Sequence, residues 1–266
     1  MRNPVSLWRG FLARPNDDRV KIFGVAFLTA VFSAVVVTVA SVTLEPLQDA
    51  HLEAERAARM EQMLDTLPGM RDIMAEAGVD ALTTRLVDLE TGAFVEEPDA
   101  ETYDLREAEN DPERSVEIQP EADLARLGRR ARIAPVYLLE RDGDILLVVL
   151  PVSGKGYQST LRATLALHAD LTTIAALTIT EQAETPGLGA RAETPQWQDL
   201  WAGKEVTDET GQIVIDVVRG QAKGPHEVDA ISGATITSNG VANMLRYWLG
   251  DDGFGPFLDR LREEGM

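Results

Sequence analysis

The longest apolar stretch of the chain runs from Ile22 to Leu44 and contains 23 residues without a charge. As a helix rising about 1.5 Å per residue, it is long enough to span a bilayer core of about 30 Å. It exceeds the apolar core of a signal peptide, about 7–15 residues, and no Ala-x-Ala cleavage pattern precedes Glu45. The pattern therefore favours an uncleaved membrane anchor over a cleaved signal peptide.

The chain after this anchor is predicted to alternate between helical and extended segments. Leu47 to Leu64 has apolar residues at helical spacing and predicts an amphipathic stalk, and Met70 to Ala77 predicts a second short helix. Arg85 to Val95 reads as a hairpin that turns at Thr91-Gly92. Residues 96–130 are charge-dense, which predicts a solvated excursion with a short helix at its end.

Strand patterns dominate the next part of the chain. Val136 to Leu139 and Ile145 to Leu150 flank Asp142-Gly143-Asp144, a hairpin signature. Thr160 to His168 alternates strictly, so one face of this strand, bearing Leu161, Ala163, Leu165 and Leu167, is expected to be buried. Further strands are predicted at Thr172 to Thr180 and at Ile213 to Val218.

Three helices are predicted in the last third, at Pro195 to Trp201, Val241 to Leu249 and Gly255 to Glu263. Because strands and helices do not alternate as βαβ units, the predicted fold class is α+β with an antiparallel sheet.

Charge divides the chain into two unequal parts. The net charge is −19, but residues 1–21 carry +3 and the remainder −22. Basic residues before a membrane span mark its cytoplasmic side. The predicted organisation is a cytoplasmic segment 1–21, a transmembrane helix 22–44, and a periplasmic domain 45–266 of a single-pass inner-membrane protein. The acidic balance argues against nucleic acid as a partner.

Metal and thiol chemistry have little support in the composition. The chain has no cysteine and three separated histidines, His51, His168 and His226. Iron-sulfur clusters, disulfides and Cys/His zinc sites are thereby excluded or disfavoured. His168 reads as a surface residue. Any redox chemistry must come from a non-metal cofactor.

Small and hydroxyl-bearing residues gather between Asp229 and Gly240, directly before the helix predicted at Val241. Gly233 and Ala234 would let a phosphate approach the backbone, and first-turn amides favour an anion. The same residue types are also ordinary helix caps, and on spacing alone a capped helix is the better interpretation.

This segment resembles the flavinylation motif of membrane redox proteins, in which a transferase joins FMN to a threonine through a phosphoester. The match, Asp229-x-x-Ser232-Gly233-Ala234-Thr235, implies attachment at Thr235, with Asp229 helping the transferase to recognise the motif. Ser232, Gly233 and Ala234 are implied as neighbours of the cofactor, and Thr237 is the nearest alternative acceptor.

A second candidate segment is Glu184-Thr185-Pro186-Gly187-Leu188-Gly189, where Pro186-Gly187 predicts a tight turn. By itself it would be an ordinary turn. Beside a flavin, Leu188 would pack on the ring, and Glu184, Thr185 and Gly189 would lie close to it. Lys155 and Lys223 are candidates for the phosphate or ribityl region, with surface salt bridges as the alternative.

Several separated motifs resemble the NqrC family, the C subunits of sodium-translocating NADH:quinone oxidoreductases. They lie at residues 44–48, 86–92, 151–156, 184–189 and 250–258, in the same order as in that family. Two departures are Tyr157-Gln158, where the family often has Leu-Trp, and Ala176, where it often has Gly.

The resemblance implies an FMN-carrying electron relay that passes electrons from NADH-derived carriers toward quinone in a sodium-pumping, multi-subunit membrane complex. The chain would act as one subunit of the oxidoreductase and would not be catalytic alone. Expected partners are the other subunits, a flavin transferase and membrane lipid. Two alternatives remain open: the G subunit of an Rnf-type ferredoxin-linked complex, and a membrane-anchored binding module without flavin.

Overall fold

The computed structural model describes residues 82–264, together with residues 13, 15, 18, 19, 21–24, 26, 27 and 29–34. The chain divides into two units, residues 1–59 and 60–266. The predicted stalk at Leu47 to Leu64, the helix at Met70 to Ala77 and His51 lie outside the described residues.

The described residues between 19 and 34 are helical. Their large apolar side chains are exposed, namely Ile22, Phe23, Phe27, Val31 and Phe32. Within the part of the chain that the structure describes, no helix has both the length and the apolar character of a membrane span. The predicted anchor at Ile22 to Leu44 is described only in part.

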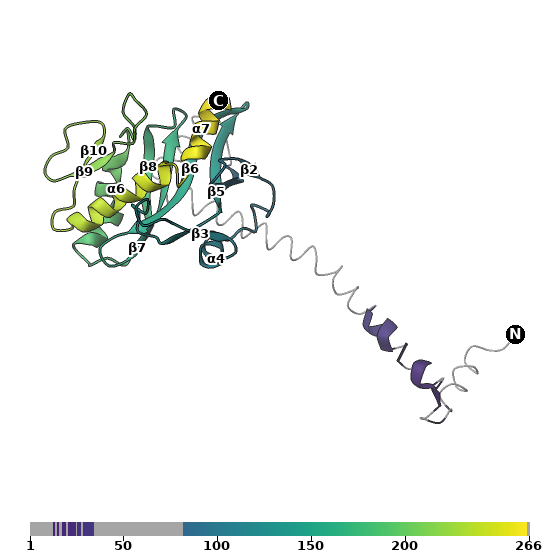
Figure 1. Ribbon diagram of the computed structural model, residues 1–266. Coiled ribbons are helices and arrows are strands. Elements are labelled where there is room, and N and C mark those ends of the chain that lie inside the picture. Colours follow the sequence, from purple (N-terminus) through teal and green to yellow (C-terminus); the bar gives the residue numbers. More distant parts are fainter. Residues whose placement is uncertain are drawn as a thin grey trace. The chain divides into compact units, whose positions relative to one another are not determined.

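The second unit is built on a six-stranded antiparallel sheet in the order β2-β1-β5-β6-β7-β8 (Figure 1). Its strands are β1 (Thr83–Asp88), β2 (Phe94–Val95), β5 (Ile133–Arg141), β6 (Asp144–Lys155), β7 (Thr160–His168) and β8 (Ile174–Glu181). The predicted α+β class with an antiparallel sheet is therefore confirmed.

Positive backbone angles fix the two predicted hairpins. Gly92 closes the β1–β2 turn with a φ of 68°. Asp142 and Gly143, with φ of 57° and 97°, join β5 to β6. Two successive residues with positive φ match the turn whose twist suits a two-residue hairpin, so the Asp-Gly signature correctly predicted this connection.

The alternation predicted for Thr160 to His168 is confirmed by β7, whose bounds are the same. Its apolar face joins the main core, together with Val148, Leu150 and Val152 of β6. The opposite face is not wholly polar, because Ala166 is fully buried in a second, smaller cluster with Leu147 and Val149. Both faces of the central strands therefore bury side chains.

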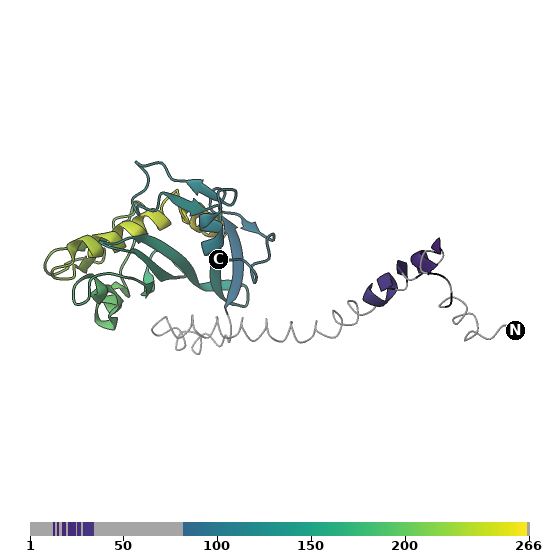
Figure 2. The same cartoon turned by 90° about the horizontal axis from the view of Figure 1, so that it is seen from below.

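Helix α6 (Thr235–Leu249) lies along the main core face of the sheet (Figures 1 and 2). Glycines bring it very close to β6: a Cβ at Gly240 would lie 2.5 Å from the carbonyl oxygen of Lys155, and one at Gly154 would lie 2.8 Å from Cβ of Met244. The indole of Trp248 donates to the carbonyl of Ser153 at 2.7 Å. These contacts fix the helix on the strand that leads into the candidate site.

The remaining helices agree with the predictions in position. The segment at 195–201 forms two short helices, α5 (Pro195–Gln198) and η2 (Asp199–Trp201), after η1 (Gly189–Glu193). The last helix is α7 (Gly255–Glu264).

The prediction for residues 96–130 was wrong in detail. The helix, α4 (Leu105–Asn110), lies in the first half, where the Asp104 carboxylate caps it and Ala108 is buried. At the predicted place, Arg126 and Gly128 have φ of 56° and 74°, which no α-helix accommodates. The segment also holds β3 (Ser115–Glu117), which pairs with β4 (Arg129–Ala131).

Two boundaries also differ from expectation. Regular strand in the range Ile213 to Val218 is confined to β9 (Asp216–Val218), which pairs in parallel with β10 (Glu227–Asp229) outside the main sheet. Helix α6 begins six residues before Val241, at Thr235. The second half of the motif at 229–240 therefore supplies the first turns of the helix, and only residues 230–234 form a loop before it.

Candidate functional site

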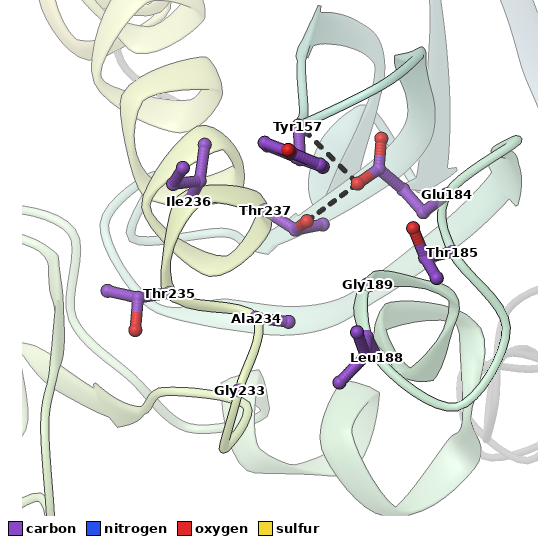
Figure 3. A pocket seen from close by; sticks show the side chains of 10 residues that line it. All are labelled: Tyr157, Glu184, Thr185, Leu188, Gly189, Gly233, Ala234, Thr235, Ile236 and Thr237. Carbon is purple, nitrogen blue, oxygen red and sulfur yellow. Dashed lines mark hydrogen bonds between the residues drawn. The ribbon is translucent and has the colours of Figure 1, made fainter.

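Three segments that are distant in sequence surround one cavity of about 440 Å³. They are the β6–β7 turn, the loop after β8 and the start of α6. The lining residues are Tyr157, Glu184, Thr185, Leu188, Gly189, Gly233, Ala234, Thr235, Ile236 and Thr237 (Figure 3). The structure thus brings together the two motifs that the sequence analysis placed beside a cofactor.

The start of α6 lies at this cavity, and no side chain of the described residues caps its first turn. Its N-cap residue, Ala234, has no side chain that could accept from the first turn. The preceding turn is held instead by Ser238, whose hydroxyl donates to the carbonyl of Ala234 and accepts from the amide of Ile231, each at 3.0 Å. An uncapped N-terminus of a fifteen-residue helix carries partial positive charge and favours an anion.

The carboxylate of Glu184 connects all three segments. Its Oε1 accepts from the amides of Gln158 and Ser159 and from the Ser159 hydroxyl, each at 2.9 Å. Its Oε2 accepts from the amide of Tyr157 at 3.1 Å and from the hydroxyl of Thr237 at 2.6 Å. Five donors from two other segments therefore converge on one side chain that is only 5% exposed.

These contacts keep Glu184 ionised. Burial alone would raise the pKa of its carboxyl group, but hydrogen bonds from Thr237, Ser159 and Gln158 outweigh burial and lower the pKa to about 2. Two glycines make room for the group: a Cβ at Gly156 or Gly189 would lie 2.7 Å from a Glu184 oxygen.

The two threonines of the motif have different environments. Residues two apart in a helix lie about 200° apart around its axis, and Figure 3 shows Thr237 facing Glu184 while Thr235 faces away from it. Thr237 is buried, and its hydroxyl donates a hydrogen bond to Glu184. Thr235 is half-buried, and its hydroxyl has no hydrogen-bond partner among the described residues. Of these two threonines, Thr235 is the one whose hydroxyl is available for reaction.

Large apolar side chains are exposed around the cavity. Tyr157, Leu188 and Ile236 are 60%, 44% and 54% exposed, although each lines it. Such exposure costs free energy in water and marks a binding surface.

The loop after β8 has the predicted tight turn. Gly187 has a φ of 76°, and the Leu188 amide donates to the carbonyl of Thr185 at 3.1 Å, which matches a type II turn. The turn holds Leu188 near the α6 start, where a Cβ at Gly233 would lie 3.1 Å from its Cδ2.

Four residues predicted for the site do not line the cavity. Asp229 supports the fold, because its Oδ1 accepts from the Ala222 amide at 2.5 Å. Ser232 is exposed. The Lys155 ammonium lies 3.5 Å from the carbonyl oxygen of Gln158. Lys223 is exposed, and its backbone amide donates to the Glu227 carboxylate.

Neither of the two histidines that the structure describes, His168 and His226, lines the cavity. His168 is exposed, as expected of a surface residue, and His226 lies with Nδ1 2.9 Å from the carbonyl oxygen of Glu205.

Two contributing residues, Ile236 and Ser159, were not identified from the sequence, and Tyr157 was noted only as a departure from the family pattern. Ile236 directly follows Thr235, and this adjacency could have identified it as a residue of the site. Tyr157 and Ser159 follow Gly154-Lys155-Gly156, where the recognised motif ended. The Tyr157-Gln158 departure places a phenol ring at the cavity.

The site fits FMN. The cavity has the size of a small-molecule site, apolar side chains are available for the isoalloxazine, and free helix amides are available for a phosphate.

Comparisons with known proteins agree with this chemistry. Residues 156–250 match the family described as FMN-binding domain. The chain is 40% identical over 254 residues to the C subunit of the Na⁺-translocating NADH-quinone reductase of Vibrio alginolyticus, covering 95% of this chain and 98% of that protein. It is 39% identical over 256 residues to the corresponding protein of Pseudomonas aeruginosa, covering 93% and 98%.

Solved structures show the same relationship. The crystal structure of Shewanella oneidensis NqrC matches with a TM-score of 0.69 and 31% identity, over 79% of this chain and 99% of that chain. The C subunit from Parabacteroides distasonis matches with a TM-score of 0.54 and 26% identity, over 80% and 96%.

Proposed function

We propose that this chain, which belongs to the NqrC family of Na⁺-translocating NADH-quinone reductase subunits, carries its FMN on Thr235 through a phosphoester bond. As a member of this family it is an FMN-carrying electron-transfer subunit of an oxidoreductase complex. Beyond this family membership, we propose the covalent bond and the position of the protein in the membrane.

The observation that carries the covalent assignment is the difference between Thr235 and Thr237. Thr235 lines the cavity and its hydroxyl has no hydrogen-bond partner among the described residues, whereas the Thr237 hydroxyl donates to Glu184. A hydroxyl of ordinary pKa needs activation to attack phosphorus, so a separate flavin transferase would supply the base and metal.

The chain's own residues would hold and orient the cofactor. The free amides at the start of α6 would stabilise the charge of the phosphoester, and Tyr157, Leu188 and Ile236 would cover the ring. FMN supplies one- and two-electron transfer when bound. Attachment through the phosphate leaves the ring free to exchange electrons.

A membrane location is proposed for the N-terminal region. The uncharged run Ile22 to Leu44 and the exposed apolar side chains at Phe23, Phe27 and Phe32 support a single-pass anchor. The basic residues before it support a cytoplasmic N-terminus and a periplasmic FMN domain at 45–266. Lipid, the other subunits and the transferase would then be the partners.

The sodium path and the NADH site are assigned to other subunits. A single uncharged span offers no ionisable group for an ion site, and the sequence lacks a Gly-rich dinucleotide motif after a strand. Membership of the NqrC family favours this complex over one of the Rnf type.

Denaturing gel electrophoresis tests attachment and separates the proposal from a flavin-free binding module. The full-length chain, produced with its flavin transferase, should give a fluorescent band after denaturation, because only a covalent flavin survives. A dark band of fully produced protein would refute covalent attachment.

A further inference from the structure

The cavity has a buried negative charge in its wall. Glu184 lines the cavity and is ionised, yet no Lys, Arg or His forms an ion pair with it within the described part of the chain. The donors that contact it are neutral: three successive amides, of residues 157–159, and the hydroxyls of Ser159 and Thr237.

Neutral donors stabilise a carboxylate without removing its net charge. Successive amides that point at one anion form a concave nest, whose dipoles offset the cost of burial. The remaining unit charge acts through the protein interior, where it is screened less than in water. The part of a ligand that lies beside Glu184 therefore experiences a fixed negative potential, in contrast to the part that lies at the start of α6.

We propose that Glu184 tunes the FMN bound in this cavity by lowering its reduction potential. The inference rests on the proposed function. Reduction adds two electrons to the flavin, and solvent protons balance the added charge only partly at neutral pH. A fixed anion in the wall disfavours the extra negative charge, so the reduced form becomes less stable. Glu184 is thus a tuning and positioning residue, not a catalytic one.

The direction in which the reduction potential shifts distinguishes an effect of charge from an effect of packing. Glu184→Gln removes the charge and should make flavin reduction more favourable. Ser159→Ala and Thr237→Val each remove one donor while the carboxylate stays ionised, because its pKa starts at about 2. Loss of a donor dipole leaves the negative charge less offset, so these two variants should shift the potential in the opposite direction. Ser159 does not line the cavity, which makes it the cleaner control.

The experiment is a dithionite titration of full-length flavinylated protein in detergent at pH 7 against a reference dye. Glu184→Gln should raise the equilibrium constant for flavin reduction about tenfold, which is the effect of one charge within a site. Ser159→Ala and Thr237→Val should lower it. An unchanged constant in Glu184→Gln, or a rise in all three variants, would overturn the proposal.

In Glu184→Gln, an amide nitrogen replaces a carboxylate oxygen that accepts hydrogen bonds. Because this nitrogen cannot accept from the same donors, the variant can fail to fold. The other two variants then decide: a lower constant in both supports the proposal, and an unchanged or higher constant overturns it. Wild-type protein that binds no flavin would instead refute the proposed function, and this inference with it. A flavin that is bound but insensitive to these changes refutes this inference alone.

Discussion

The hydroxyl of Thr237 donates a 2.6 Å hydrogen bond to Oε2 of Glu184, and both side chains are buried. This contact ties the first turn of α6 to the loop after β8, and it commits one of the two threonines of the motif to the fold. The Thr235 hydroxyl, by contrast, has no hydrogen-bond partner among the described residues.

Attachment should therefore depend on Thr235 and not on Thr237. Full-length Thr235→Ala, produced with the transferase, should show no flavin fluorescence in a denaturing gel, whereas Thr237→Val should retain it. The intact mass of each protein checks the result. Wild-type fluorescence on folded Thr235→Ala would contradict the assignment.

The same contact predicts a cost in stability. Thr237→Val removes a hydrogen bond to a charged group, so the free energy of unfolding should fall by about 1.5–3 kcal/mol. Urea denaturation followed by tryptophan fluorescence measures it. Ile236→Val, at an exposed position of the same turn, is the control and should change stability by less than about 1 kcal/mol. Equal losses in both variants would count against a specific role for the bond.

The close packing of α6 on β6 should not tolerate a methyl group. A Cβ at Gly240 would meet the carbonyl of Lys155, a backbone atom that cannot rotate away. Gly240→Ala should lower the free energy of unfolding by about 1–3 kcal/mol. Gly224→Ala, where a Cβ would have no neighbour within 4 Å, should be nearly neutral. A neutral Gly240→Ala would mean that the helix is not so closely seated.

Acid should destabilise the domain through Glu184. Its folded pKa, about 2, lies below the unfolded value of 4.5, so its contribution is complete above about pH 4.5 and is lost as the pH falls toward 2. The difference corresponds to about 3 kcal/mol. Urea midpoints between pH 6 and about pH 3 should fall more steeply in wild type than in Glu184→Gln. Parallel pH profiles would contradict this account.

Membrane topology can be tested because the chain has no cysteine. Glu121→Cys, at an exposed position, should react with an impermeant maleimide in spheroplasts, whereas Asn3→Cys should react only after the membrane is permeabilised. The opposite labelling pattern would place the FMN domain in the cytoplasm.

Local patterns predicted the sheet well. Asp142-Gly143 identified the β5–β6 hairpin, and strict alternation identified β7, because both signals are encoded within a few residues. The position of α4 and the β3–β4 pair were not predicted. Helix α4 makes contacts that are distant in sequence, such as the ion pair between Arg162 and Glu109, and β3 pairs with residues 12 to 16 positions further along the chain.

The start of α6 shows a second limit of sequence analysis. Thr235, Thr237, Ser238 and Gly240 are weak helix formers and read as a loop. Tertiary contacts outweigh this preference. Glu184 accepts a hydrogen bond from the Thr237 hydroxyl, and Gly240 permits the close approach of α6 to β6. The motifs predicted which segments would meet, and the resemblance implied attachment at Thr235 rather than Thr237. What the sequence could not supply is the physical difference between them: the Thr237 hydroxyl donates to Glu184, whereas the Thr235 hydroxyl has no partner among the described residues.

The central claim, that FMN on Thr235 is a necessary carrier between NADH and quinone, is tested most directly in the assembled complex. Steady-state quinone reduction by NADH should be abolished in the Thr235→Ala complex, while NADH oxidation by an artificial acceptor upstream should remain near the wild-type rate. Quinone reduction at the wild-type rate in that variant would contradict the claim.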